Sequence, residues 1–209
     1  MREIGRSRRS VLLLLSCVAT LWWPLWIATA GDTLPAEPEF SGTLIKRVDG
    51  KQYDVQVFGK GDRLRLEYRY AIRTERGFSA IEIIRLDLGE RWYILPQQKH
   101  ILVLPVRDDA PSIRTELVGE TSRIIVGDAT VAGRAARLFN VHVERNGFPE
   151  RFYEWVDAEV GIVLKLVSQD RDWSFEYERL RISPQPRMYF EEPPGYSKRL
   201  SEAFQRHEK

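Results

Sequence analysis

Apolar and polar residues alternate along most of the chain from Phe40 onward, with a period of two residues. The segment 63–70 (RLRLEYRY) is the clearest case, because leucine and tyrosine occupy its even positions and arginine and glutamate its odd positions. Successive side chains of a strand point to opposite faces, whereas a helix would place apolar residues three or four apart. The pattern therefore predicts a strand with one buried face and one solvent face.

The same pattern predicts ten more strands, separated by short links. They are expected at 40–48, 51–58, 80–86, 91–95, 99–104, 121–126, 135–144, 150–156, 162–168 and 173–182. Asp49-Gly50 and Asn146-Gly147 are two-residue hairpin signals, and glycine-containing breaks stand at 59–62, 87–90, 127–128 and 161. Because a parallel crossover needs a dozen residues or more, these links predict sequential antiparallel pairing.

Some central strands, such as 101–104 and 162–167, are apolar at successive positions and hence on both faces. An antiparallel sheet with one solvent face should alternate cleanly. Two interpretations remain open: a closed barrel or sandwich with a filled core, or a curved sheet whose concave face binds an apolar ligand. The longest stretch without strand character is 105–120, in which 109–117 can begin a short helix.

The first thirty residues predict export. Met1–Ser10 carries four arginines and one glutamate, Val11–Ile27 is almost wholly apolar, and Ala28-Thr29-Ala30 matches a signal-peptidase site. We expect a signal peptide over 1–30 cleaved after Ala30, an extended lead-in over 31–39, one β domain over 40–198 and a charged tail over 199–209. The alternative is an uncleaved inner-membrane anchor over 11–30, since this stretch is about as long as a membrane-spanning helix.

Composition argues against several classes of function. The chain carries 32 Lys and Arg against 30 Asp and Glu, and the leader takes four basic residues and one acidic residue, so the remainder is near neutral. It has no basic block of the kind that binds nucleic acid. Cys17 is the only cysteine and lies in the leader, so the exported part has no disulfide, thiolate nucleophile or cysteine metal site.

No pattern in the exported part indicates catalysis. His100 and His142 lack a nearby histidine at metal-ligand spacing, and the chain has no nucleophile elbow, Walker loop or dinucleotide fingerprint. We therefore expect no catalytic, cofactor-binding or metal-binding residues; a hydrolase would have to use His100 or His142. The strand carboxylates alternate with apolar residues as on a solvent face, and the aromatic residues of the strands indicate either a core or a cavity for acyl chains. The carboxylates in question are Glu82, Asp87, Glu150, Glu154, Glu176 and Glu178.

The order of these elements resembles the LolA/LolB-like group of periplasmic lipoprotein carriers and their outer-membrane lipoprotein-sorting relatives. The resembling segments are 40–44 (FSGTL), 58–67 (FGKGDRLRLE), 84–87 (IRLD), 91–99 (RWYILPQQK), 155–157 (WVD), 161–165 (GIVLK) and 190–196 (FEEPPGY). The resemblance implies a mainly β fold, a strongly curved antiparallel sheet forming an open half-barrel, with a small helical lid. The carriers' N-terminal helix has no counterpart in the short, proline-containing segment 31–39, so the lid is expected at 107–118.

The resulting hypothesis is a non-enzymatic periplasmic binding protein that holds a lipid, an acyl chain or a lipidated protein in the concave apolar face. The expected lining is Leu64, Leu66, Trp92, Ile94, Phe139, Val141, Trp155 and Phe175. Any membrane contact would be transient, and no cofactor is expected. The alternative is an envelope-stress sensor or adaptor that binds a protein partner on the same scaffold, as RseB-like domains do, with an exposed edge strand pairing to the partner.

Overall fold

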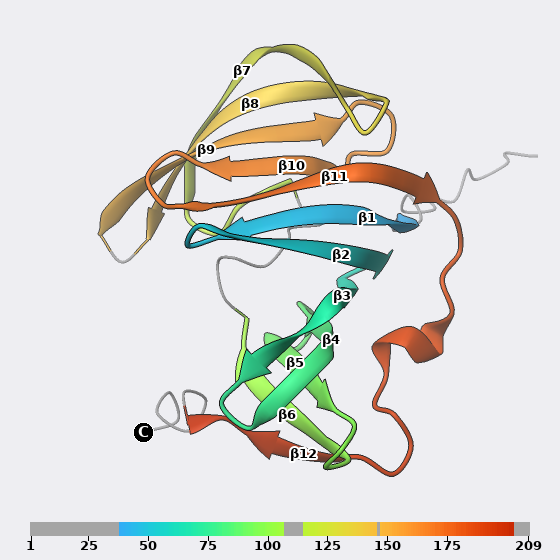
Figure 1. Cartoon of the computed structure of the whole chain (residues 1–209). Coiled ribbons are helices and arrows are strands. Elements are labelled where there is room, and N and C mark those ends of the chain that lie inside the picture. Colours follow the sequence, from blue (N-terminus) through green and yellow to red (C-terminus); the bar gives the residue numbers. More distant parts are fainter. Residues whose placement is uncertain (1–37, 107–114, 146, 203–209) are drawn as a thin grey trace, which may run out of the picture. The chain divides into compact units, whose positions relative to one another are not determined.

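The computed structural model describes residues 38–106, 115–145 and 147–202, which lie within one compact unit, Ala36–Lys209. They form a 12-stranded sheet in the order β12-β6-β5-β4-β3-β2-β1-β11-β10-β9-β8-β7 (Figure 1). The strands are β1 Glu39–Val48, β2 Lys51–Lys60, β3 Arg63–Thr74, β4 Gly77–Arg85, β5 Glu90–Leu95, β6 His100–Pro105, β7 Glu120–Val131, β8 Arg134–Arg145, β9 Phe148–Asp157, β10 Val163–Ser168, β11 Trp173–Ile182 and β12 Ser197–Leu200. Neighbouring strands are antiparallel except β12, which runs parallel to β6.

The eleven strands expected from the alternation are all present. One break is wrong: β7 continues through Gly127-Asp128, because a bulge between Ile125 and Gly127 takes up the extra residue without ending the ladder with β8. One strand was missed: β12 includes Arg199 and Leu200, which we had assigned to the tail. The leader at 1–30, most of the lead-in and the end of the tail lie outside the described residues.

Glycines act at two kinds of position. In the β1–β2 hairpin, Asp49 and Gly50 have φ of 50° and 71°, the positive values that a two-residue hairpin turn requires. Within β2, Gly59 faces Phe40, and a Cβ at Gly59 would lie 2.3 Å from that ring. The missing side chain therefore lets the Phe40 ring lie directly on the β2 backbone.

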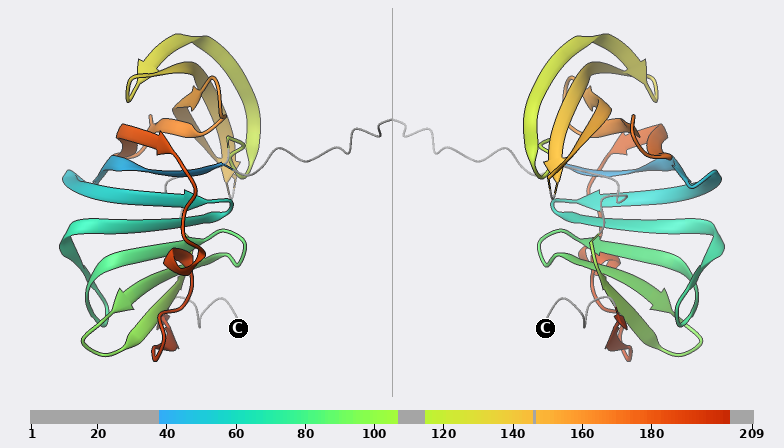
Figure 2. Two further views of the ribbon diagram at one scale, coloured as in Figure 1. Left: turned by 90° about the vertical axis from the view of Figure 1, so that its right-hand side faces the viewer. Right: turned by 90° about the vertical axis from the view of Figure 1, so that its left-hand side faces the viewer.

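The sheet is curved and open, as Figures 1 and 2 show. The largest apolar cluster joins Ile84 of β4 to Val141 of β8, strands that are far apart in the sheet order. Only the inside of the curve brings such strands together, so this cluster lies on the concave face. Its buried members are Phe40, Leu44, Val55, Val57, Leu64, Leu66, Tyr68, Ile84, Leu117, Val141, Val143, Phe152, Ile162, Val163, Leu166, Trp173, Phe175 and Tyr177.

A second apolar cluster lies on the opposite face of β4, β5 and β6, and comprises Ile83, Trp92, Ile94, Ile101 and Val103. The segment 183–200, here called the C-terminal strap, packs on this face through Tyr196. Its 3-10 helix, η1 (Arg187–Phe190), sets the Tyr189 ring 5.1 Å from that of Phe58, and β12 then pairs with β6. The strap explains why these central strands are apolar on both faces without being closed into a barrel.

The helical lid expected at 107–118 is not supported. Residues 107–114 lie outside the described residues, and 115–118 form bends and a turn instead of a helix. Within the part of the chain that the structure describes, no helix has the length and apolarity needed to cross a membrane.

Candidate functional site

The structure distributes the expected lining residues over three apolar clusters. Leu64, Leu66, Val141 and Phe175 are at most 1% exposed in the concave-face cluster, and Phe139 packs against it. Trp92 and Ile94 lie on the opposite face beneath the strap, and Trp155 packs against a third cluster formed by Val131, Ala136 and Leu164. Five of the eight are thus together and three are elsewhere. The five contact the protein's own core, and their role as ligand lining stays a prediction.

The concave face also buries three of the six strand carboxylates that were expected to face solvent, whereas Asp87 and Glu178 are exposed as expected and Glu176 is half-buried. Glu82, Glu150 and Glu154 are only 1%, 4% and 0% exposed. The sequence pattern misled because each carboxylate lies at ion-pair distance from an arginine of another strand, which offsets part of the desolvation that would otherwise exclude it from a core.

The Glu82 group spans three strands. Arg91 Nε of β5 lies 2.9 Å from Glu82 Oε1 of β4, and Tyr68 of β3 donates its hydroxyl hydrogen bond to the same carboxylate. Burial, together with the nearby charge of Glu82, raises the pKa of Tyr68 well above its ordinary value. The tyrosine therefore stays protonated and acts as a fixed donor.

The Glu154 group ties the start of β7 to β9. Arg123 donates hydrogen bonds to Glu154, to Glu120 (2.8 Å, Nε to Oε1) and to the carbonyl oxygen of Thr115. Burial raises the pKa of Glu154 to about 7, against the opposing hydrogen bond and charge of Arg123. A carboxyl with such a pKa can serve acid–base chemistry, but Glu154 is 0% exposed and lines neither of the two cavities described next.

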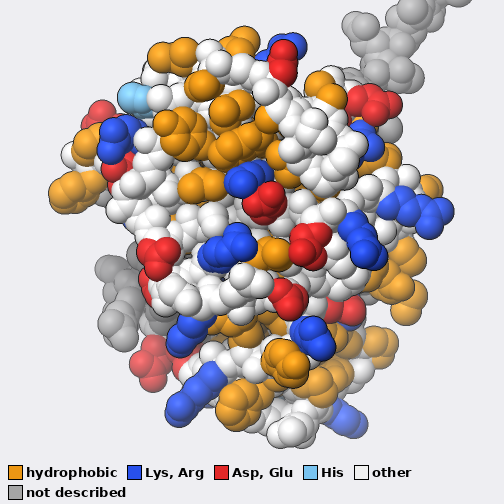
Figure 3. Space-filling view, turned by 45° about the horizontal axis from the view of Figure 1, so that its top comes forward, with side chains coloured by type: hydrophobic (Ala, Val, Ile, Leu, Met, Phe, Trp, Pro, Cys, Tyr) orange, Lys and Arg blue, Asp and Glu red, His pale blue; other side chains and the backbone are white. Residues whose placement is uncertain are grey.

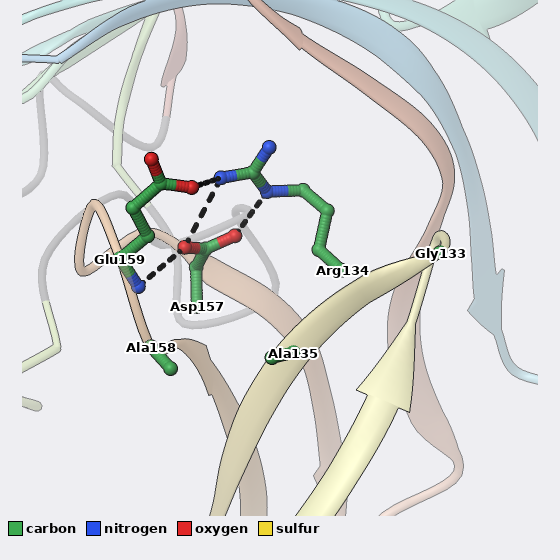
Figure 4. A pocket seen from close by; sticks show the side chains of 6 residues that line it. All are labelled: Gly133, Arg134, Ala135, Asp157, Ala158 and Glu159. Carbon is green, nitrogen blue, oxygen red and sulfur yellow. Dashed lines mark hydrogen bonds and ion pairs between the residues drawn. The ribbon is translucent and has the colours of Figure 1, made fainter.

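Two surface cavities have linings of mixed polar and apolar character. One, of about 520 Å³, lies between the β7–β8 and β9–β10 turns (Figure 4), where Arg134 pairs with Asp157 and with Glu159 at 3.0 Å. Asp157 also accepts hydrogen bonds from the backbone N–H groups of Glu159 and Val160 at 2.9 Å. The charged side chains of this cavity therefore already pair with one another. The other, of about 390 Å³, is lined by residues of β1, β2, β3 and β11. Neither resembles an acyl-chain site.

The two candidate histidines are not brought together. His100 begins β6 and His142 lies in β8, and these strands are not neighbours in the sheet. Among the described residues, no three His, Asp, Glu or Cys side chains are grouped so as to hold a metal ion.

An apolar surface, on which Ile124 and Tyr153 are exposed and the other side chains are half-buried, lies on the outer face of β7–β10. We call it the β7–β10 patch and define it by Ile124, Leu138, Tyr153, Trp155 and Val167. Leu138 lies opposite Trp155 and Tyr153 opposite Val167, so these side chains share one face across neighbouring strands. The Tyr153 and Trp155 rings are 6.2 Å apart, and Figure 3 shows hydrophobic side chains gathered over this part of the sheet.

A charged pair borders the patch. Lys165 Nζ lies 4.9 Å from the centre of the Trp155 ring and 2.7 Å from the Glu176 carboxylate. Both charges lie at the border, and none of the five residues that define the patch is charged. Of the five residues of the patch, the sequence pattern indicated Trp155 alone. Alternation along a single strand does not show the register between strands, which places Leu138 and Tyr153 on the same face as Trp155.

Ile124 extends the patch to the β7 edge, whereas Ile125, opposite Phe139, points to the other face. Ile124, Ile125 and Val126 are 58%, 59% and 55% exposed, and among the described residues β7 pairs with β8 alone. The opposite edge of the sheet, β12, is only four residues long and carries Lys198 and Arg199. Short, basic edges resist further pairing, whereas long apolar ones favour it.

Comparison with known proteins yields fold similarity only. No family model and no curated protein matches the chain. A crystal structure of MucB matches with a TM-score of 0.52 and 17% identity, covering 76% of this chain and 58% of MucB. MucB in complex with MucA(peri) matches with a TM-score of 0.47 and 17% identity, covering 75% of this chain and 55% of that chain. A putative outer membrane lipoprotein-sorting protein domain from Vibrio parahaemolyticus matches with a TM-score of 0.36 and 9% identity, covering 73% of this chain and 89% of that chain.

This chain therefore spans a little over half the length of MucB. At this level of identity the likeness shows a shared fold. The open curved antiparallel sheet expected from the sequence is confirmed, and MucB shares this fold.

Proposed function

We propose that this chain is an exported, non-catalytic binding domain, and that it contacts a protein of the cell envelope through the β7–β10 patch and the β7 edge. The observation that carries the proposal is the apolar outer face on which Ile124 is 58% and Tyr153 38% exposed, with the Tyr153 and Trp155 rings 6.2 Å apart. Contiguous exposed apolar surface is uncommon on proteins that bind nothing. Aromatic side chains also supply much of the binding energy in protein interfaces.

Three further points support a protein partner outside the cytoplasm. The leader has the pattern of an export signal. On the concave face, side chains such as Leu66 and Phe152 are buried, at 0% exposure. MucB, whose fold this chain shares, has been solved in complex with MucA.

Photo-crosslinking in cells tests the proposal. The full chain carries p-benzoylphenylalanine at Tyr153, or at Phe78 as the control, since Phe78 is 66% exposed in β4, away from the patch. We expect a discrete protein adduct from position 153 and none from position 78. No adduct at 153, or the same adducts from both positions, would contradict the proposal.

A lipid or acyl chain in the concave face is the second candidate. It is favoured by one observation: the largest apolar cluster lies inside the curve of a sheet that is not closed. A guest there would have to displace core side chains such as Phe139, which is only partly buried at the margin of the cluster. Native mass spectrometry of the full chain with palmitate should then show a one-to-one complex, and protein that stays empty would rule this candidate out.

A further inference from the structure

The mode of partner binding is suggested by what the sheet already does at its other end. We infer that the partner contributes an extended peptide segment that pairs with β7 as an added strand and lays side chains on the β7–β10 patch. This inference rests on the proposed function and specifies the partner's conformation and chemistry.

The first support is the backbone of β7. Among the described residues this 12-residue strand pairs on one side only, so donors and acceptors on its other side are available to an added strand. Two bulges, after Glu120 and after Ile125, interrupt its ladder with β8. The regular stretches offered to a partner are therefore 122–125 and 127–131.

The second support is the C-terminal strap, which shows this fold accepting such a segment. The strap leaves β11 and ends as a strand added to the β6 edge (Figure 1). Its Tyr196 packs on the apolar face of β5 and β6. Lys198 Nζ then lies 4.2 Å from the centre of the Trp92 ring. At this end of the sheet, the strap therefore both covers the apolar face around Trp92 and pairs with the β6 edge.

The β7 end of the sheet has the same components without a described segment on them. Trp155 is the centre of an outer apolar face, Lys165 lies 4.9 Å from its ring, and β7 forms the adjoining edge. An occupant built like the strap, extended and with apolar side chains at alternate positions, matches both the edge and the face.

Charge adds one requirement to the occupant. Asp128 of β7 is 91% exposed, and Arg137, its ion-pair partner, is at 4.0 Å, the limit of an ion pair. Arg123 on the same strand is instead engaged by Glu120 and Glu154. The partner segment should therefore carry a lysine or arginine near Asp128, as β12 carries Lys198 and Arg199 on the other edge.

The test uses a random peptide library displayed on phage and selected on the immobilised full chain. We expect selected peptides to have alternating apolar residues and a basic residue. Their binding should weaken by about tenfold or more in Ile124→Lys and in Asp128→Lys, but not in Phe78→Lys. Equal melting temperatures of the three variants would establish that the losses are not due to unfolding.

Backbone methylation of a selected peptide separates the binding mode from the site. If the peptide adds as a strand, N-methylation at alternate residues facing β7 should weaken binding about tenfold, whereas methylation at the intervening residues should not. Loss in Ile124→Lys without this alternation would overturn strand addition and leave the proposed patch intact. Binding unaffected by both Ile124→Lys and Asp128→Lys, or a partner found to be a second copy of the chain or a lipid vesicle, would overturn the inference.

Discussion

Replacing Glu154 by glutamine should change how stability depends on pH. Glu154 is 0% exposed on the concave face, where burial raises its pKa to about 7 despite the hydrogen bond from Arg123. Glutamine has nearly the same shape and does not ionise. The substitution therefore removes the titration while keeping the volume, at the cost of the ion pair with Arg123.

The size of the effect follows from linkage. A glutamate ordinarily has a pKa of 4.5, so a pKa of about 7 in the folded protein means that ionising Glu154 costs folding roughly 3 kcal/mol, at about 1.36 kcal/mol per pKa unit. Because the pKa is raised on folding, the stabilising contribution is fully present below pH 4.5. It is lost as pH rises through 7. Wild type should therefore lose up to roughly 3 kcal/mol relative to Glu154→Gln between pH 4.5 and pH 8.

Urea unfolding of both proteins across this range measures the difference, with the unfolding free energy extrapolated to water. Asp157→Asn is a control of opposite sign: burial acts to raise the pKa of Asp157, but hydrogen bonds from Arg134 and from backbone amides outweigh it and lower the pKa. Its contribution is present above the ordinary pKa and is lost as pH falls. A wild-type to Glu154→Gln difference that does not vary with pH, or that grows in favour of wild type as pH rises, would show that Arg123 keeps Glu154 ionised and would refute the reasoning.

Four further substitutions, one of them an exposed control, test the packing. Gly59→Ala should destabilise by about 1–3 kcal/mol in urea unfolding, because its Cβ would lie 2.3 Å from the Phe40 ring. Phe152→Ala, at 0% exposure, should cost about 3–5 kcal/mol in the same assay, whereas Phe78→Ala, at 66% exposure, should change stability by less than about 0.5 kcal/mol. Tyr196→Ala should cost about 1 kcal/mol and loosen the strap, so limited proteolysis should cleave it faster than in wild type.

The strands were predictable because alternation and turn chemistry are local. Arg63–Thr74 begins where its charged and apolar positions begin to alternate, and Asp49-Gly50 has the positive φ values that its sequence suggested. β12 was not predictable in this way: Ser197–Leu200 is short and exposed throughout, and it is a strand because the β6 edge accepts it.

The faces of the sheet were not predictable, for a physical reason. Alternation shows that Ile83 and Ile84 point to opposite sides, but the curvature of the whole sheet decides which side is concave. Trp92 was therefore grouped with Leu66, although the two lie in clusters on opposite faces. The burial of the carboxylates was not predictable for a similar reason. Arg123, which pairs with Glu154, is distant from it in sequence and becomes its neighbour only through the order of β7, β8 and β9.

We propose that the binding surface lies on the outside of the sheet, and not on the inside as the sequence led us to expect. The concave face has its apolar side chains packed against one another and its carboxylates paired with arginines, so a guest there must first break existing contacts. The outer face of β4–β6 is covered by the strap. The β7–β10 patch exposes apolar groups, with Ile124 at 58% and Tyr153 at 38%, and its contact requires no such disruption. On these grounds a partner strand on β7 costs the fold less than a lipid inside the curve.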